Sequence, residues 1–396
     1  MAAANAVTAH WRGGFDEPAL QAFALNLRRQ LAQPVSLGLL FMAPRFFDNA
    51  GQILDIFRVH GEIPLLMGCS SSGLIAGAQE IEEDNGLVLG LYSLPGGALN
   101  ARYFSQSDVD SAGSEEDWCL QTSVNPTETN GWLVFADPFH LDISGWLNSW
   151  NRSYPAVPVF GGLASGQPGE ERTQLYLNGD VYEEGVIALS CGGLVALTGI
   201  TSQGCTPIGE AWTITRTERN IIHSIGNRPA YEVLNETFAS LQPVDQEKTQ
   251  GNLFVGLVIN EYLDEFRRGD FLVRNLIGAD PSCGAIAIGE IPRVGQTLQF
   301  QRRDAEAASE DLLALLARVE RDLDPERILG GCLFCCNGRG YRMFGHPSHD
   351  AKMIQENLGP IGLTGFFCNG EIGPVGGKNF IHGYTASLAL FVRKQA

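Results

Sequence analysis

The sequence predicts an α/β protein of two packed domains, built from mixed β-sheets that are flanked by helices. Three observations support this prediction. The chain has 396 residues, which is too long for one ordinary core and suits two or three domains. Its content of 44% hydrophobic and 18% charged residues is typical of a globular protein with a large buried fraction. The third observation is a pattern of strands and helices that recurs three times along the chain.

Each copy of this pattern consists of an apolar strand, a helix, a second apolar run and a closing strand, which is a β-α-β unit followed by one more strand. The expected elements are residues 37–41, 48–61, 64–67 and 87–92 in the first copy, 132–136, 142–151, 158–160 and 186–189 in the second, and 332–336, 350–357, 361–364 and 386–391 in the third.

In every copy the second apolar run leads into Gly-x-x-x-x-Gly with identical spacing. These segments are 68–73, 161–166 and 365–370. We expect them to form glycine-rich turns at the strand ends, on the edge where α/β proteins usually bind ligands.

The pattern changes between the second and third copies. Proline is favoured at the first helical position, so Pro229 is expected to begin a helix. The elements expected in this region are strands at 212–215 and 220–223, a turn at 226–228, a helix from 229 to about 238, strands at 253–259, 271–276 and 285–288, and a helix over 305–323. Another helix is expected near the N-terminus, where Leu20, Phe23, Leu27 and Leu31 share one face.

The charge balance excludes several classes of partner. The formal net charge is −18 and no run of Lys or Arg is longer than a pair, so neither nucleic acid nor an anionic membrane surface is expected to bind. No apolar stretch is long enough to span a membrane, and the first ten residues lack the pattern of a secretory signal. Most of the nine cysteines lie in apolar runs, as in proteins of a reducing compartment, and we expect a cytoplasmic protein.

The first glycine segment, Gly-Cys-Ser-Ser-Ser-Gly at 68–73, resembles a phosphate loop only in its two glycines. Leu74 follows where such a loop has lysine, so nucleoside triphosphate binding is not expected. Cys69, Ser70 and Ser71 are instead candidate contacts to a small polar ligand. The alternative is a serine-rich turn whose hydroxyls bond their own backbone.

Four further candidates follow the strands of the third copy. Asn337 and Arg339 follow one strand, and Asn369 and Glu371 follow the next apolar run. If these strands are parallel neighbours, both turns project from one edge of the sheet. Arg339 and Glu371 then either pair with each other or hold opposite ends of a zwitterionic ligand. The sequence leaves both alternatives open.

Cysteine and histidine chemistry gives less specific signals. Cys332 and Cys335 form Cys-x-x-Cys, but without a second pair the buried thiols of a strand are favoured, and no metal is expected. His382 is a candidate ligand contact or a structural hydrogen-bonding group. Cys69, or Cys368 with His382, would serve a cysteine-dependent enzyme of acyl or thiol chemistry, but no complete catalytic constellation is visible and no catalytic residue is assigned. A structural adaptor is the third alternative.

Two polar segments are expected to be ordinary surface turns. One is 267–270, and the other contains Glu80, Glu82, Glu83 and Asp84. Asp137 is a separate case, because it ends a strand, where it either begins a turn or faces the same ligand edge.

The C-terminal run from Gly365 through Thr385 places many glycines, an amide, a carboxylate and an imidazole between two apolar runs. Together with the segment at 68–73, it closely resembles the FIST family of small-ligand-binding sensory domains, whose N- and C-terminal halves match in order. The resemblance extends from about residue 30 to the C-terminus. It implies an N-terminal-like domain over 1–212 and a C-terminal-like domain over 213–396.

The resemblance also implies a function. It indicates a sensory protein that binds a small polar molecule such as an amino acid and signals through a separate partner protein, because no segment is left for an output domain. No cofactor is expected. Some relatives bind haem, which would need an axial histidine, for which His223, His346 and His382 are candidates.

Overall fold

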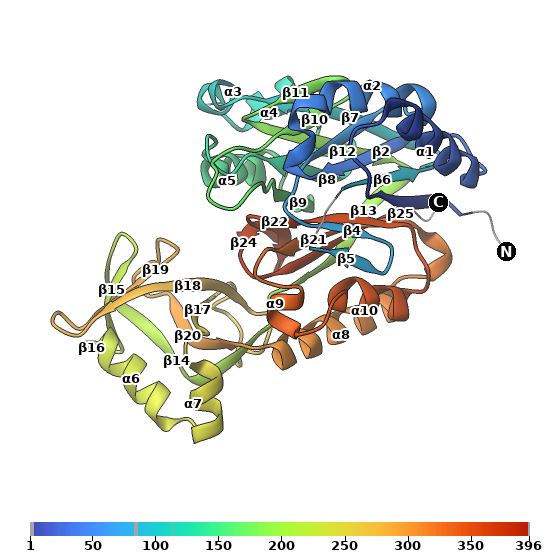
Figure 1. The fold of residues 1–396 in the computed structure, drawn as a ribbon. Helices are drawn as coiled ribbons and strands as arrows, with labels where there is room; N and C mark the ends of the chain where they lie inside the picture. The colour runs from blue at the N-terminus through green and yellow to red at the C-terminus, as the bar shows by residue number, and fades with distance from the viewer. Residues whose placement is uncertain (1–3, 83–85, 113, 395–396) are drawn as a thin grey trace. The chain divides into compact units, whose positions relative to one another are not determined.

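A computed structural model describes residues 4–82, 86–112 and 114–394 (Figure 1). Within these residues the protein is a mixed α/β fold with four mixed or antiparallel sheets and ten α-helices, which confirms the predicted fold class. No helix in the described part of the chain is both long enough and apolar enough to cross a bilayer.

The chain forms two compact units. Unit 1 comprises Met1–Thr201 and Leu315–Ala396, and unit 2 comprises Ser202–Ala314. Unit 2 is therefore an insertion in the sequence of unit 1. The predicted boundary between residues 212 and 213 concerns the family domains and stays a prediction.

Unit 1 contains the three predicted β-α-β units, which we call repeats 1, 2 and 3. In repeat 1, β2 (Leu37–Met42) and β3 (Leu66–Ser70) are parallel neighbours, connected through η1 (Pro44–Asn49) and α2 (Ala50–His60), and β6 (Leu87–Tyr92) pairs antiparallel with β2. Repeat 2 has β8 (Thr129–Ala136), α5 (Ile143–Ser153), β9 (Val159–Leu163) and β12 (Val186–Gly193). Repeat 3 has β21 (Ile328–Cys336), α9 (Tyr341–Phe344), α10 (His349–Leu358), β22 (Leu363–Cys368) and β25 (Ala386–Arg393). The predicted strands and helices of all three repeats are confirmed.

Each repeat also has an edge strand and a hairpin. The edge strands are β1 (Ala6–Trp11), β7 (Gly97–Phe104) and β13 (Val195–Ser202). Between edge strand and repeat the chain contains α1 (Glu17–Gln30) in the first case, and α3 (Gln106–Ser111) and α4 (Glu115–Thr122) in the second. In the third case the elements of unit 2 come first, followed by α8 (Ala305–Asp322) and η2 (Pro325–Arg327). The hairpins follow the glycine segments and are β4 (Leu74–Ala76) with β5 (Gln79–Ile81), β10 (Leu175–Leu177) with β11 (Asp180–Tyr182), and β23 (Glu371–Val375) with β24 (Lys378–His382).

These hairpins are exchanged between the repeats in a cycle. The hairpin of repeat 1 pairs with β22 of repeat 3, that of repeat 2 pairs with β3 of repeat 1, and that of repeat 3 pairs with β9 of repeat 2. Every six-stranded sheet of unit 1 is thus completed by another repeat, and the three sheets are interlocked through backbone hydrogen bonds.

The first glycine of each Gly-x-x-x-x-Gly segment differs from the prediction of a turn, because it lies inside a strand. Gly68, Gly161 and Gly365 occupy the same register position in β3, β9 and β22. A Cβ atom there would lie 1.7, 1.9 and 2.0 Å from the carbonyl oxygens of Leu40, Val134 and Leu333, respectively, on the parallel neighbour. Close approach of two backbones, rather than a turn, therefore requires glycine at these three positions.

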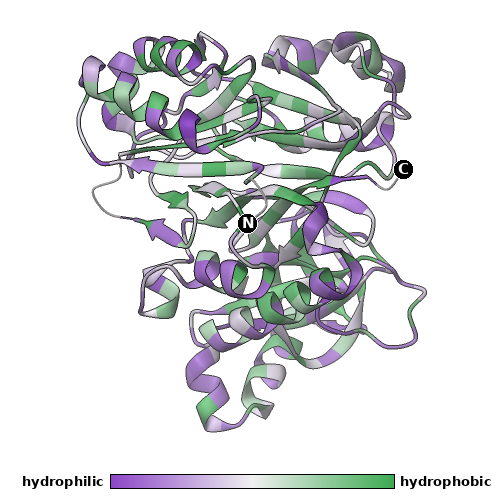
Figure 2. Cartoon of the chain, turned by 90° about the vertical axis from the view of Figure 1, so that its right-hand side faces the viewer, coloured by the Kyte–Doolittle hydropathy of each residue, from purple (hydrophilic) through white to green (hydrophobic). Residues whose placement is uncertain are grey.

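The core of unit 1 also follows the repeat. Phe41, Phe135 and Phe334 each follow the strand residue that faces the glycine, and they meet in one apolar cluster. The ring centroids of Phe41 and Phe135 are 5.3 Å apart, those of Phe135 and Phe334 are 6.1 Å apart, and Phe366 lies 4.6 Å from Phe41. In Figure 2 the strands carry most of the apolar colour, whereas the helices alternate between polar and apolar turns. The three sheets thus share one core.

Unit 2 is an antiparallel sheet with the strand order β14-β20-β17-β18-β19-β15-β16 and its own apolar core. Its elements are β14 (Cys205–Glu218), β15 (Ile221–Ile225), β16 (Arg228–Pro229), α6 (Ala230–Ser240), α7 (Pro243–Thr249), β17 (Leu253–Val258), β18 (Phe271–Asp280), β19 (Ala285–Ile288) and β20 (Thr297–Arg303). All the strands predicted for this region are present. The predicted helix begins one residue later than expected, at Ala230, and the sequence did not indicate α7 or β20.

Candidate functional site

The three glycine segments meet in unit 1 and are joined by backbone hydrogen bonds. The Phe367 N–H donates to the Gly73 carbonyl at 2.9 Å, and the Ser165 N–H donates to the Ser70 carbonyl at 3.2 Å. A third bond, from the Leu163 N–H to the carbonyl of Gly370 in the next segment, is 2.8 Å long. Each segment is therefore bonded to both of the others.

The fifth residue of each segment is polar, and these residues form one hydrogen-bonded group. Ser72 donates its backbone N–H to the Ser165 hydroxyl at 2.9 Å, and the two hydroxyl oxygens are 3.2 Å apart. The Asn369 side-chain amide donates to the Ala164 carbonyl at 3.1 Å. Equivalent positions of the three repeats thus supply polar groups to one place.

Asn337 joins this group from the end of β21. Its side-chain oxygen accepts a hydrogen bond from the Ser72 hydroxyl at 2.8 Å, and its amide nitrogen donates to the side-chain oxygen of Asn369, also at 2.8 Å. Strands β21 and β22 are parallel neighbours, as the sequence argument required. Asn337 and Asn369 therefore lie side by side; that they bind a ligand stays a prediction.

A cleft of about 910 Å³ opens beside these side chains. Its lining combines the polar group Ser72, Asn337 and Asn369 with the segment 166–171, the apolar residues Pro138, Phe139 and Phe367, and the charged residues Glu82 and Arg342. Elements of all three repeats line it. Ser72 is not among the residues predicted from the sequence, although it occupies the same position in its glycine segment as Asn369 does.

The hydroxyls of Ser70 and Ser71 do not line this cleft. Ser70 donates to the Ser165 carbonyl at 2.9 Å, and Ser71 donates to the Phe367 carbonyl at 3.1 Å. Cys69 is buried in the apolar core, where burial raises the pKa of its thiol well above the ordinary value. These three residues hold the segments together and have no surface in the cleft.

Arg339 forms a buried ion pair with Asp350 instead of the predicted pair with Glu371, and it does not line the cleft; that it contacts a ligand stays a prediction. The guanidinium donates to both Asp350 carboxylate oxygens, at 2.7 and 2.8 Å. Burial would raise the pKa of Asp350, but the Arg339 charge and hydrogen bonds lower it below its ordinary value. The Asp350 carboxylate belongs to α10, an element that sequence spacing could not place beside Arg339.

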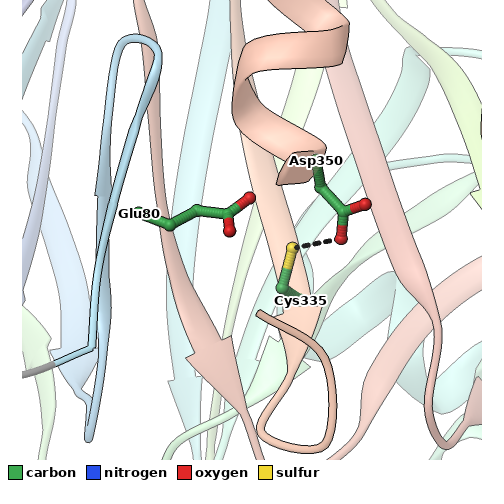
Figure 3. A group of neighbouring side chains, drawn as sticks. All are labelled: Glu80, Cys335 and Asp350. Carbon is green, nitrogen blue, oxygen red and sulfur yellow. Dashed lines mark hydrogen bonds between the residues drawn. The ribbon is translucent and has the colours of Figure 1, made fainter. Parts of the chain in front are cut away.

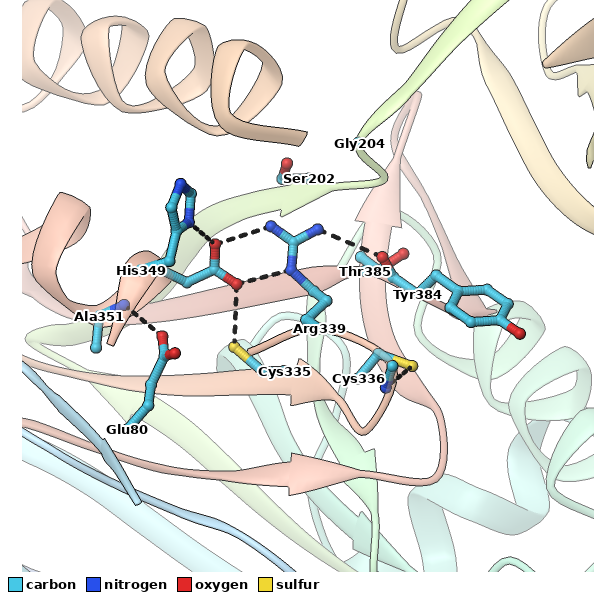
Figure 4. A network of polar contacts seen from close by, with 12 residues as sticks. Glu80, Ser202, Gly204, Cys335, Cys336, Arg339, His349, Ala351, Tyr384 and Thr385 are labelled. Atoms are coloured by element: carbon cyan, nitrogen blue, oxygen red, sulfur yellow. Dashed lines mark hydrogen bonds and ion pairs between the residues drawn. The ribbon is translucent and has the colours of Figure 1, made fainter. Parts of the chain in front are cut away.

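Further side chains complete the network around this pair (Figure 4). The His349 ring Nδ1 lies 2.9 Å from an Asp350 oxygen, the Cys335 thiol donates to the other at 3.6 Å, and Arg339 donates to the Tyr384 carbonyl at 3.4 Å. Every charge in the network therefore has a polar neighbour, which is the condition for burying charges in a protein.

Glu80 is buried rather than solvated, contrary to the expectation of a surface turn. The residue is 7% exposed, and one carboxyl oxygen accepts the backbone N–H of Ala351 at 2.8 Å (Figure 4). Burial, followed by the charge of Asp350, raises the pKa of Glu80 to about 7. Glu82 is half-buried, and Glu83 and Asp84 lie outside the described residues.

Glu80, Cys335 and Asp350 bring an oxygen, a sulfur and an oxygen within 4.8 Å of one another (Figure 3). The trio does not suit a metal ion. Both Asp350 oxygens already accept hydrogen bonds from a guanidinium, whose charge would repel a cation. Burial also raises the pKa of the Cys335 thiol, whereas a metal ligand must be a thiolate. Cys332, the other half of Cys-x-x-Cys, packs in the apolar core.

Glu371 and His382 are register partners in the β23–β24 hairpin and are both buried. One Glu371 oxygen accepts the backbone N–H of Thr385 at 3.0 Å, and burial raises the pKa of this carboxyl well above its ordinary value. The His382 ring Nε2 lies 3.0 Å from the Gly373 carbonyl. Neither residue lines the cleft, so their contacts within the described chain are structural.

The cysteines proposed for catalysis and the histidines proposed for haem binding do not line the cleft either. Cys368 is buried, and burial raises the pKa of its thiol, which does not suit a nucleophile. None of the haem candidates His223, His346 and His382 lines the cleft. His382, being buried against a carbonyl, presents no open face to an axial position, so the residues present do not fit haem at this site.

Asp137 begins a turn, which is one of its two predicted roles, and does not line the cleft. Its carboxylate accepts the Thr173 hydroxyl at 2.7 Å and the backbone N–H of His140 at 2.6 Å, which makes it a buried turn residue. The residues that follow it, Pro138 and Phe139, line the cleft.

Comparison with known proteins shows matches over most of the chain. The FIST N domain matches residues 36–228 and the FIST C domain matches residues 230–374. An uncharacterized protein of Mycobacterium tuberculosis strain CDC 1551 (MT0656) is 37% identical over 372 residues, which cover 93% of this chain and 94% of that protein. An uncharacterized protein of Mycobacterium bovis (Mb0898c) is 38% identical over 359 residues, 90% of each chain. An F-box/LRR-repeat protein of Arabidopsis thaliana is 36% identical over 69 residues, 17% of this chain and 13% of that protein. From these matches, the chain belongs to the FIST family.

Proposed function

We propose that this protein is a small-ligand-binding sensory protein, and that its ligand binds in the cleft where the three glycine segments meet. The observation that carries the proposal is the hydrogen-bonded group of Ser72, Ser165, Asn337 and Asn369, which gathers polar side chains from all three repeats beside one cavity. Small-molecule sites typically combine such a cavity with a few convergent polar groups.

The lining supports a small polar ligand of the amino-acid type. The cavity volume of about 910 Å³ lies within the range of small-molecule sites, about 300–1,000 Å³. Arg342 offers a guanidinium for a carboxylate, and Glu82 offers a carboxylate for an ammonium group. Phe139 and Phe367 supply apolar surface. We therefore expect a molecule with charges of both signs.

Signalling through a separate partner protein is part of the proposal. A ligand in this cleft would contact elements of all three interlocked sheets, so its binding free energy would favour one arrangement of them. The proposed role is binding rather than catalysis, because the buried thiols suggested for an enzyme have raised pKa values and no access to the cleft.

The test is calorimetric titration of amino acids into the purified protein, after native mass spectrometry has identified any co-purified molecule. Ser72→Ala and Asn369→Ala are expected to weaken binding about tenfold or more, because each removes hydrogen bonds from the polar group. Ser111→Ala, an exposed serine on α3 that does not line the cleft, is the matched control. Unchanged affinity in both cleft variants would show that the ligand binds elsewhere.

A further inference from the structure

We propose that the ligand of this cleft carries a net positive charge, as a basic amino acid does, and that Glu82 is the carboxylate that receives its cationic group. This inference rests on the proposed function. Three glutamates line the cleft, Glu82, Glu170 and Glu171, whereas Arg342 is the one cation among the described lining residues. A ligand that is neutral overall would leave this excess of carboxylates unbalanced, so charge complementarity favours a cation.

Glu82 is the carboxylate that the fold holds in place. One of its oxygens accepts the backbone N–H of Tyr341 at 2.8 Å. The residue before Tyr341 is Gly340, at a positive φ of 64°, and a Cβ atom there would lie 2.5 Å from one Glu82 oxygen and 2.6 Å from the other. A side chain at Gly340 would displace the Glu82 carboxylate from this position. A carboxylate with a fixed position loses little conformational entropy when a ligand binds, which is the advantage of a preorganised site.

Glu82 lines a second cavity as well as the cleft. This second cavity, of about 840 Å³, is lined by Glu80, Glu82, Arg12 and Arg342 among others, so Glu82 and Arg342 belong to the walls of both cavities. A ligand bound beside both residues can place its carboxylate on Arg342 and its ammonium or guanidinium group on Glu82. Phe139, which is 40% exposed, lies in the same cleft and can cover an alkyl stem or a cation.

The experiment is calorimetric titration of the full chain at low ionic strength with L-lysine, L-arginine, L-leucine and L-glutamate. We expect L-lysine or L-arginine to bind at least about tenfold more tightly than L-glutamate. Glu82→Gln should abolish most of this preference, and added salt should reduce it. The matched control is Glu116→Gln, an exposed glutamate that lines neither cavity. Circular dichroism shows whether Glu82→Gln is folded; if it is not, the double variant Glu170→Gln, Glu171→Gln in the exposed loop takes its place and should weaken the preference.

Each result decides a different claim. Equal affinity for L-leucine and L-lysine, lost in Ser72→Ala, would overturn the charge inference and leave the proposed function standing. Tight binding of L-lysine that Ser72→Ala and Asn369→Ala do not change would overturn the proposed site. Failure of all four amino acids to bind, or a co-purified anion in the native mass spectrum, would overturn the inference that the ligand is a cation.

Discussion

Glu80 and Asp350 show how two carboxyl groups of one buried cluster acquire opposite proton affinities. Asp350 accepts two hydrogen bonds from Arg339, which lower its pKa, whereas Glu80 accepts one backbone N–H and faces the charge of Asp350. Breaking a buried ion pair by removing one partner typically costs about 3–5 kcal/mol. Substitution of Arg339 is therefore expected to affect folding rather than ligand contacts.

Glu80→Gln should change how stability depends on pH. The folded pKa of Glu80, about 7, lies above its ordinary value of 4.5, so the folded state binds this proton more tightly than the unfolded state does. The resulting stabilisation is complete below the unfolded pKa and is lost as pH rises through about 7, a change of about 3 kcal/mol in the free energy of unfolding. Glutamine is neutral at every pH, so the free energy of unfolding of the variant should lack this change with pH. The variant should therefore be more stable than the parent at pH 8.

Urea unfolding at several pH values between 5 and 8 measures this effect. The charged groups that act on Glu80 are Asp350, Arg339 and Glu82, and all three are retained in the variant. If the free energy of unfolding depended on pH with the same slope in the parent and in the variant, Glu80 would not be the titrating group.

At the scale of elements, the glycine segments connect strand pairing with the site. The first glycine of each segment allows two parallel strands to approach closely, and the fifth residue, four positions later, contributes to the hydrogen-bonded polar group beside the cleft. Backbone groups at the strand ends also form hydrogen bonds between the segments. The position of the polar side chains therefore depends on the exact register of three parallel strand pairs.

Gly365→Ala is expected to destabilise the protein by about 3 kcal/mol or more, because its Cβ atom would lie 2.0 Å from the Leu333 carbonyl oxygen and force the strands apart. Gly51→Ala is the control. Gly51 lies in α2 with no atom within 4 Å of an added Cβ, and alanine there should stabilise by about 0.5–1 kcal/mol. Denaturant unfolding measures both variants. A destabilisation by Gly365→Ala of less than about 1 kcal/mol would contradict the close approach.

At the scale of the molecule, unit 1 is assembled from segments that are far apart in the sequence. Repeat 3 supplies β21, β22 and β25 of its own sheet, an exchanged hairpin for the sheet of repeat 2, and Phe334 and Phe366 of the shared core. The hairpin of repeat 1 in turn pairs with β22. Repeats 1 and 2 therefore depend on a part of the chain that follows unit 2.

A fragment of residues 1–314 should consequently fail to fold its unit 1 segment. Four tryptophans of repeat 2 are fully buried in the intact chain, namely Trp118, Trp132, Trp146 and Trp150. Their fluorescence in the fragment should resemble that of the urea-unfolded chain, without a cooperative transition, and co-expression of residues 315–396 should restore it. Native-like fluorescence from the fragment alone would mean that repeats 1 and 2 fold independently of repeat 3.

The sequence by itself determined the local elements and part of the candidate site. Strands, helices and the three repeats follow from hydrophobic period and glycine spacing, which depend on neighbouring residues in the chain. The adjacency of Asn337 and Asn369 was also predictable, because consecutive parallel strands end on the same edge.

Only the tertiary structure decided which repeat each hairpin joins. The surroundings of the other candidate residues, Glu80 and Arg339 among them, follow from that packing. Glu80 is buried because its hairpin crosses to the sheet of repeat 3, and Arg339 pairs with Asp350 because α10 packs beside the end of β21. An exchanged hairpin has the same alternation of side chains as one that folds back on its own sheet. The choice between them depends on packing in the shared core, which no local pattern records.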